Sequence, residues 1–219
     1  MKYVCAILCL SLLIACNQND SAKKETTPTV DSNKSVSERT PPAQQQATAP
    51  KEDSMLLITL SEQILGSLKA KDFSKLASYV HPGYGLRFCP YAYVDTQHSQ
   101  RLSPKQLANA GAQKRSLTWG SFDGKDSAIK MDIRKYFDRF VYDKDFLHAQ
   151  ERSVNRFLGG GNSLNNLKDV YPEANFTEFY FPGFDPKYDG MDWRTLRLVF
   201  KMENNKPWLI AIVHDEWTI

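Results

Sequence analysis

The chain has 219 residues, of which 42% are hydrophobic and 12% aromatic, and its formal net charge is only +3. Its charged side chains are interspersed, with no basic run typical of nucleic-acid binding and no basic amphipathic stretch typical of a membrane surface. The composition therefore predicts a folded globular region and argues against nucleic acid as a partner.

Residues 1–15 have the features of a lipoprotein signal peptide. Lys2 supplies a positive charge, and the apolar run from Val4 to Ala15 is too short to cross a hydrocarbon core about 30 Å thick. The run ends in the sequence Leu13-Ile14-Ala15-Cys16, which resembles the lipobox of bacterial lipoproteins. This resemblance implies that a diacylglyceryl group is attached to the sulfur of Cys16 and that the chain is cut before this residue.

We therefore expect a lipoprotein of the cell envelope, on the extracytoplasmic side of a membrane. Acyl chains such as palmitate on Cys16 would make the lipid bilayer its first partner, because two or more chains give stable anchoring. Residues 16–54 are rich in Thr, Ser, Pro, Gln and Lys. Such a segment buries too little apolar surface to offset the entropy of ordering, so it is predicted to be a disordered linker, either a passive spacer or a recognition tail.

All Phe, Tyr and Trp residues except Tyr3 lie in residues 55–219, which are predicted to form one domain. Periodicity and turn signals predict, in chain order, helices over residues 55–70 and 73–80, a strand over 86–94, a helix over 103–112, a hairpin over 116–131, a helix over 133–141, strands over 151–157 and 176–181, and a final hairpin of strands 193–203 and 207–217. Helices followed by antiparallel strands, with one more helix inserted, indicate the α+β class.

Two resemblances extend this prediction. The long first helix, the sequence from Lys71 to Pro82 and the closing strand pair resemble the nuclear transport factor 2-like superfamily. This likeness implies a cone-like domain in which N-terminal helices pack on a curved antiparallel sheet around a pocket. A second set of segments resembles an uncharacterised family of bacterial lipoproteins: His81-Pro82, residues 87–94, Trp119-Gly120, residues 190–193 and residues 214–219. Neither resemblance implies an activity, because one fold hosts enzymes, binding modules and scaffolds.

His214 and Asp215, near the end of the last predicted strand, are the candidate catalytic residues. Adjacent strand residues point to opposite faces, so His214 and Glu216 should share one face and Asp215 should lie on the other. A histidine beside a carboxylate can act as a general base. The alternative, which we favour, is a hydrogen-bonded histidine at the rim of a sheet, and no catalytic residue is assigned.

The remaining chemistry-bearing residues give no motif. Cys89 could be a nucleophile if His81 or His98 stabilised its thiolate, but core packing is the favoured role because free cysteine is commonly buried. The four histidines, including His148, have no metal-ligand spacing, so neither a metal site nor a cofactor is predicted. The three consecutive glycines 159–161 predict a flexible loop that could border a pocket.

The aromatic residues leave two alternatives open. Tyr91, Trp119 and Trp193, together with His214, could line an apolar ligand pocket, or they could fill the core of a domain without a cavity. The favoured hypothesis is a membrane-anchored exported lipoprotein whose domain binds a small molecule or a protein partner without catalysis. The alternative is a small-molecule hydrolase or isomerase that uses a pocket histidine–carboxylate pair.

Overall fold

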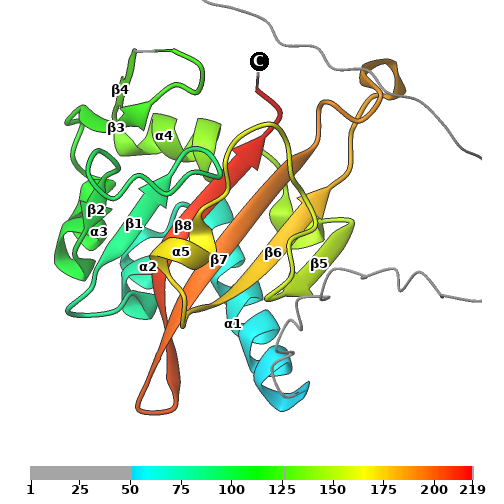
Figure 1. Cartoon of the computed structure of the whole chain (residues 1–219). Coiled ribbons are helices and arrows are strands. Elements are labelled where there is room, and N and C mark those ends of the chain that lie inside the picture. The colour runs from blue at the N-terminus through cyan, green and yellow to red at the C-terminus, as the bar shows by residue number, and fades with distance from the viewer. Residues whose placement is uncertain (1–50, 126, 219) are drawn as a thin grey trace, which may run out of the picture. The chain divides into compact units, whose positions relative to one another are not determined.

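The computed structural model describes residues 51–125 and 127–218 (Figure 1). The expected signal peptide, Cys16 and most of the expected linker lie outside these residues. The first helix, α1 (Lys51–Lys69), begins inside the predicted linker and earlier than residue 55. None of the helices in the described part of the chain is both long and apolar enough to cross a membrane.

Side chains cap the N-termini of the three helices α2 (Phe73–Tyr79), α3 (Pro104–Ala110) and α4 (Ile133–Phe140). Asp72 and Asp132 each accept a hydrogen bond from the backbone N–H three residues further on. Ser103 and Gln106 form a capping box, with each side chain bonded to the other residue's backbone N–H. Because these bonds satisfy amides that have no partner inside the helix, they fix where each helix begins.

Six strands form one sheet in the order β2-β1-β8-β7-β6-β5, and two more form a separate hairpin. The sheet strands are β1 (Leu86–Cys89), β2 (Arg101–Leu102), β5 (Glu151–Val154), β6 (Asn175–Phe181), β7 (Arg194–Glu203) and β8 (Lys206–Glu216), and the hairpin strands are β3 (Leu117–Ser121) and β4 (Ala128–Met131). Asn204 and Asn205 turn β7 into β8 with φ of 53° and 58°. This left-handed pair matches the tight hairpin turn whose twist suits the flanking strands.

The structure confirms the α+β class but corrects the expectation of a purely antiparallel sheet. β1 pairs parallel with β8, with Phe88 opposite Ile212. These strands come from the two ends of the domain sequence. Local turn signals predict which neighbouring strands form hairpins, but they carry no information about the direction in which such distant strands meet.

The two faces of the curved sheet are covered differently (Figure 1). One face packs against α1, α2 and α4 and forms the main core, which includes Phe88, Leu198 and Ile212. The opposite face carries a second cluster around Phe176 and Val213. This second face is covered by the chain between β5 and β6, which contains α5 (Leu167–Val170). Two short 3-10 turns, η1 (Phe146–His148) and η2 (Pro186–Tyr188), complete the described elements.

Candidate functional site

His214 is completely buried on the helix-covered side of β8, where strand alternation also places Glu216. Its Nδ1 lies 3.2 Å from the carbonyl oxygen of Pro90, and its Nε2 lies 3.1 Å from Oδ1 of Asp143. Both partners are acceptors, so both ring nitrogens donate only if the ring is an imidazolium. The rings of Phe140 and Phe146 pack edge-on against it. His214 is therefore buried with both ring nitrogens facing fixed acceptors.

Two arginines continue this arrangement, which we call the His214 network: His214, Asp143, Arg194, Glu216 and Arg139. Arg194 Nε donates to Asp143 Oδ2 at 3.0 Å, and Arg194 Nη2 lies 3.0 Å from Glu216 Oε2. Arg139 also bonds to the Glu216 carboxylate. Burial alone would raise the pKa of Asp143, but the bonds and charges from His214 and Arg194 outweigh it and hold that pKa below its usual value.

The same residues include a group with metal-like spacing. Ligand atoms of Asp143, His214 and Glu216 lie within 4.8 Å of one another. However, Arg194 bridges the two carboxylates, and both ring nitrogens of His214 already face acceptors of the protein. The chemistry of this donor set therefore favours an ion-pair network.

Asp215 points to the other face of the sheet, as strand alternation predicts, and joins a second cluster, the Arg197 network: Arg197, Glu178 and Asp215. Arg197 is fully buried, donating to Glu178 Oε2 at 3.1 Å and to Asp215 Oδ2 at 3.2 Å. It also donates to the carbonyl of Gly159 at 2.8 Å, and Glu178 accepts from the Gly159 N–H at 2.8 Å. Burial raises the pKa of Asp215, despite the opposing charge of Arg197. His214 and Asp215 thus belong to separate networks.

The predicted ligand-binding aromatics Tyr91, Trp119 and Trp193 are buried and pack against other aromatic rings. Trp119 stacks on Tyr136 with ring centroids 4.0 Å apart and donates from Nε1 to the Met131 carbonyl. Tyr91 packs against Phe140, and Trp193 lies near Tyr180. None of them lines any of the four hollows lined by Gln106, Leu56, Tyr171 and Asn155. That they contact a ligand stays a prediction.

Cys89 is buried, and burial raises the pKa of its thiol to about 12. A thiol with this pKa is almost wholly protonated near neutral pH, which makes it a poor nucleophile. The other histidines are held by local partners. His81 Nδ1 accepts from the backbone N–H groups of Gly83 and Tyr84. His98 and His148 pair with the acids three residues before them.

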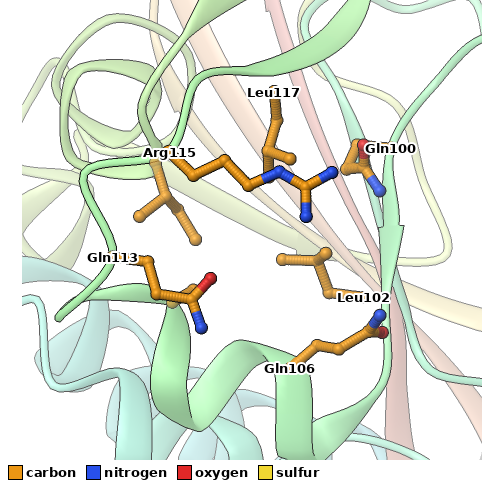
Figure 2. A pocket seen from close by; sticks show the side chains of 8 residues that line it. Gln100, Leu102, Gln106, Gln113, Arg115 and Leu117 are labelled. Carbon is orange, nitrogen blue, oxygen red and sulfur yellow. The ribbon is translucent and has the colours of Figure 1, made fainter.

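An open pocket of about 330 Å³ lies where β2, α3, β3 and α4 meet (Figure 2). We call it the polar pocket, and its lining residues are Gln100, Leu102, Gln106, Ala110, Gln113, Arg115, Leu117 and Ile133. Figure 2 shows Arg115 reaching across the pocket towards Gln100, with Gln113 and Gln106 entering from the helix side. Three amides and one guanidinium thus surround a floor of aliphatic side chains, the combination typical of a small-ligand site.

Two other hollows have fewer polar side chains in their lining. A groove of about 420 Å³ lies between α1, α2 and the β7–β8 hairpin, and is bordered by Leu56, Leu60, Tyr79 and Pro207. It lies along the N-terminal half of α1. Another, of about 380 Å³, lies beside Tyr171. Both are lined mainly by apolar groups.

Sequence reasoning did not find the polar pocket. Its glutamines are spread over three segments and resemble ordinary surface residues. One signal was present, because residues 96–122 contain no Asp or Glu but carry four cations: Arg101, Lys105, Lys114 and Arg115. A run of this kind indicates a locally positive surface.

Comparisons with known proteins leave the family open. No family model and no curated protein sequence matches the chain. A solved structure from Xanthomonas campestris, provisionally described as a calcium/calmodulin dependent protein kinase II association domain, is similar over 77% of this chain and 92% of its own, with 14% identity and a TM-score of 0.33. A protein named Rd1NTF2_05, carrying five substitutions, is similar over 74% of this chain and 98% of its own, with 12% identity and a TM-score of 0.29. Both TM-scores are below 0.5, so neither likeness carries an assignment.

Proposed function

We propose that this protein is an exported, membrane-anchored lipoprotein whose domain binds a small ligand in the polar pocket without catalysing a reaction. The proposal combines the signal-peptide and lipobox features that end at Cys16 with the chemistry of the pocket. Its fold would be the cone-like arrangement of the nuclear transport factor 2-like superfamily, supported by the helices that precede the sheet and by the long closing hairpin. The bilayer would hold the protein through acylated Cys16.

The observation that carries the binding function is the composition of the polar pocket. Three glutamines and Arg115 offer donors and acceptors to a ligand, and the described residues that line it include neither an acid nor a nucleophile. General acid–base or nucleophilic chemistry needs such a group within hydrogen-bond reach of the reacting atoms. The pocket is therefore equipped to recognise a molecule and not to transform it.

The alternative, a hydrolase or isomerase using His214 with a carboxylate, has less support. The pair exists, since His214 lies 3.1 Å from Asp143. Its ring, however, is completely buried, and both nitrogens face acceptors inside the core. A general base must have a lone pair that faces its substrate.

The binding function can be tested on the full chain purified from membranes. Native mass spectrometry should detect a small molecule bound to the protein. Gln113→Trp should abolish this binding, because the exposed Gln113 side chain points into the pocket and an indole would fill it. Lys114→Trp is the matched control, since Lys114 is exposed and does not line the pocket. Equal ligand occupancy in both variants would contradict the proposal.

A further inference from the structure

The polar pocket carries the positive charge of Arg115, and residues 96–122 contain no acid that could neutralise it. Arg115 lies in the acid-free run of residues 96–122. In the sequence, the acid closest to another lining residue is Asp132, just before Ile133, and its carboxylate accepts from the Lys135 N–H as the cap of α4. In such surroundings the Coulomb interaction favours an anionic ligand over a neutral or cationic one.

Arg115 itself has no ion pair and no side-chain hydrogen bond within the described residues, although it extends across the pocket (Figure 2). A guanidinium presents a planar fork of N–H donors whose geometry matches a carboxylate. A single fork among neutral amides suits a single negative charge. A doubly charged phosphate would call for further cations in the lining.

The glutamines offer the hydrogen-bond donor and acceptor that an amide group of a ligand would need. Gln106 Oε1 accepts from the Ser103 N–H at 2.9 Å, which fixes the carboxamide and leaves its NH₂ group as a donor. Gln100 uses its NH₂ group on the Arg101 carbonyl at 3.4 Å, which leaves its oxygen as an acceptor. Gln113 has no side-chain hydrogen bond among the described residues and can serve either role. Together they match the C=O and N–H of an amide.

The floor of the pocket sets the size of the remaining group. Leu102, Ala110 and Ile133 are buried there beneath the polar rim. These aliphatic side chains favour a methyl or another small apolar group. The volume of about 330 Å³ lies at the small end of the range for ligand pockets.

We infer that the ligand is an N-acylated amino acid or short peptide with small side chains and a free carboxylate, in which Arg115 binds the carboxylate and the glutamines bind the amide. This inference rests on the proposed binding function and specifies its ligand class. Arg115 is then the residue that determines specificity for the charge.

Matched probes test this assignment. N-acetyl-alanyl-alanine, its C-terminal amide and inorganic phosphate would each be titrated into the full chain in detergent, with binding followed by calorimetry. The acid should bind saturably and about tenfold more tightly than its amide, because only the acid forms charged hydrogen bonds with Arg115. Phosphate should bind more weakly than the acid.

Variants of Arg115 separate a specific contact from general attraction. Arg115→Gln should reduce the affinity for the acid about tenfold and leave that for the amide unchanged, whereas Arg115→Lys should restore only part of the loss. Lys114→Gln removes the same charge from the neighbouring exposed position and should lower the affinity for the acid far less than Arg115→Gln does.

Three results would overturn the inference: equal binding of acid and amide, binding of phosphate as tight as that of the acid, or no binding of any probe. The failure of the inference is distinguishable from failure of the binding function. If native mass spectrometry still detects a ligand that Gln113→Trp excludes, the pocket binds a different class of molecule. If it detects none, the binding function itself fails.

Discussion

His214 and Asp215 are neighbours in sequence, yet they belong to two separate networks of charged side chains on opposite faces of β8. The His214 network places Arg139, Arg194 and His214 against the carboxylates of Asp143 and Glu216. The Arg197 network holds one cation against two carboxylates. A carboxylate in cationic surroundings is stabilised in its charged form, and one in anionic surroundings is not. For Asp143, the bonds and charges from His214 and Arg194 outweigh the effect of burial and lower the pKa. For Asp215, burial outweighs the opposing charge of Arg197 and raises the pKa.

These shifts predict that two isosteric substitutions lower the free energy of unfolding by different amounts. Asp143→Asn should lower the free energy of unfolding near neutral pH by about 1–3 kcal/mol, because the variant loses charged hydrogen bonds to His214 and Arg194. Asp215→Asn should lower it less, because burial already disfavours the charge of Asp215. Urea unfolding of both variants and the unmutated protein measures the difference.

The pH dependence of stability tests the direction of each pKa shift. The folded pKa of Asp143 is lowered, so its contribution to stability is present above its unfolded pKa and is lost as the pH falls through the folded value. The folded pKa of Asp215 is raised, so folding becomes more favourable as the pH falls through it. Between about pH 5 and about pH 3, the unmutated protein should lose its advantage over Asp143→Asn and gain stability relative to Asp215→Asn. Parallel changes in both variants would contradict this account.

At the scale of elements, the loop between β5 and α5 is held on the second face of the sheet by its backbone. The N–H of Gly159 donates to Glu178 and its carbonyl accepts from Arg197, so one residue satisfies two members of the buried Arg197 network. Phe157 adds a ring 5.2 Å from the Arg197 guanidinium carbon. Further along the loop, Asn162 donates to the carbonyl of Thr218. The three glycines therefore belong to an ordered covering loop.

Two adjacent glycines in this loop should respond differently to the same substitution. A Cβ on Gly159 would meet two ring carbons of Tyr180 at 3.0 Å, whereas a Cβ on Gly160 would meet nothing within 4 Å. Gly159→Ala should lower the free energy of unfolding by about 1–3 kcal/mol through overpacking. Gly160→Ala should leave it unchanged or raise it by up to about 1 kcal/mol, because alanine restricts the unfolded chain. Thermal or urea unfolding compares the two, and equal effects would argue against a tightly packed loop.

The helices and hairpins were predictable because their signals are local. The caps at Asp72 and Ser103 and the turn at Asn204 occur within a few residues of the elements they define. Elements too short for periodicity, β2 and α5, gave no such signal. The strand predicted over residues 86–94 ends at Cys89, since Pro90 has no N–H to donate to a neighbouring strand.

At the scale of the whole molecule, the sequence could not show the contacts between distant segments. The parallel pairing of β1 with β8 and the salt bridge of Arg194 with Asp143 each join segments far apart in the chain. Alternation correctly placed His214 and Asp215 on opposite faces of their strand. It could not indicate which partners each would find there, and those partners decide whether a histidine keeps a ring nitrogen free to act as a base.

The proposed envelope location depends on a single sulfur outside the described residues. Cys16→Ser should leave an uncleaved precursor or a soluble product without lipid, because a serine hydroxyl is a far weaker nucleophile than a thiolate and cannot take up the diacylglyceryl group as a thioether. Labelling with a palmitate analogue, followed by membrane fractionation, measures both effects. Cys9→Ser is the matched control, since Cys9 lies within the segment that cleavage would remove, and it should be acylated and retained normally. Unchanged acylation and membrane retention of Cys16→Ser would mean that the protein is held at the membrane by other means, and the proposed small-ligand site would then have to be placed in a different compartment.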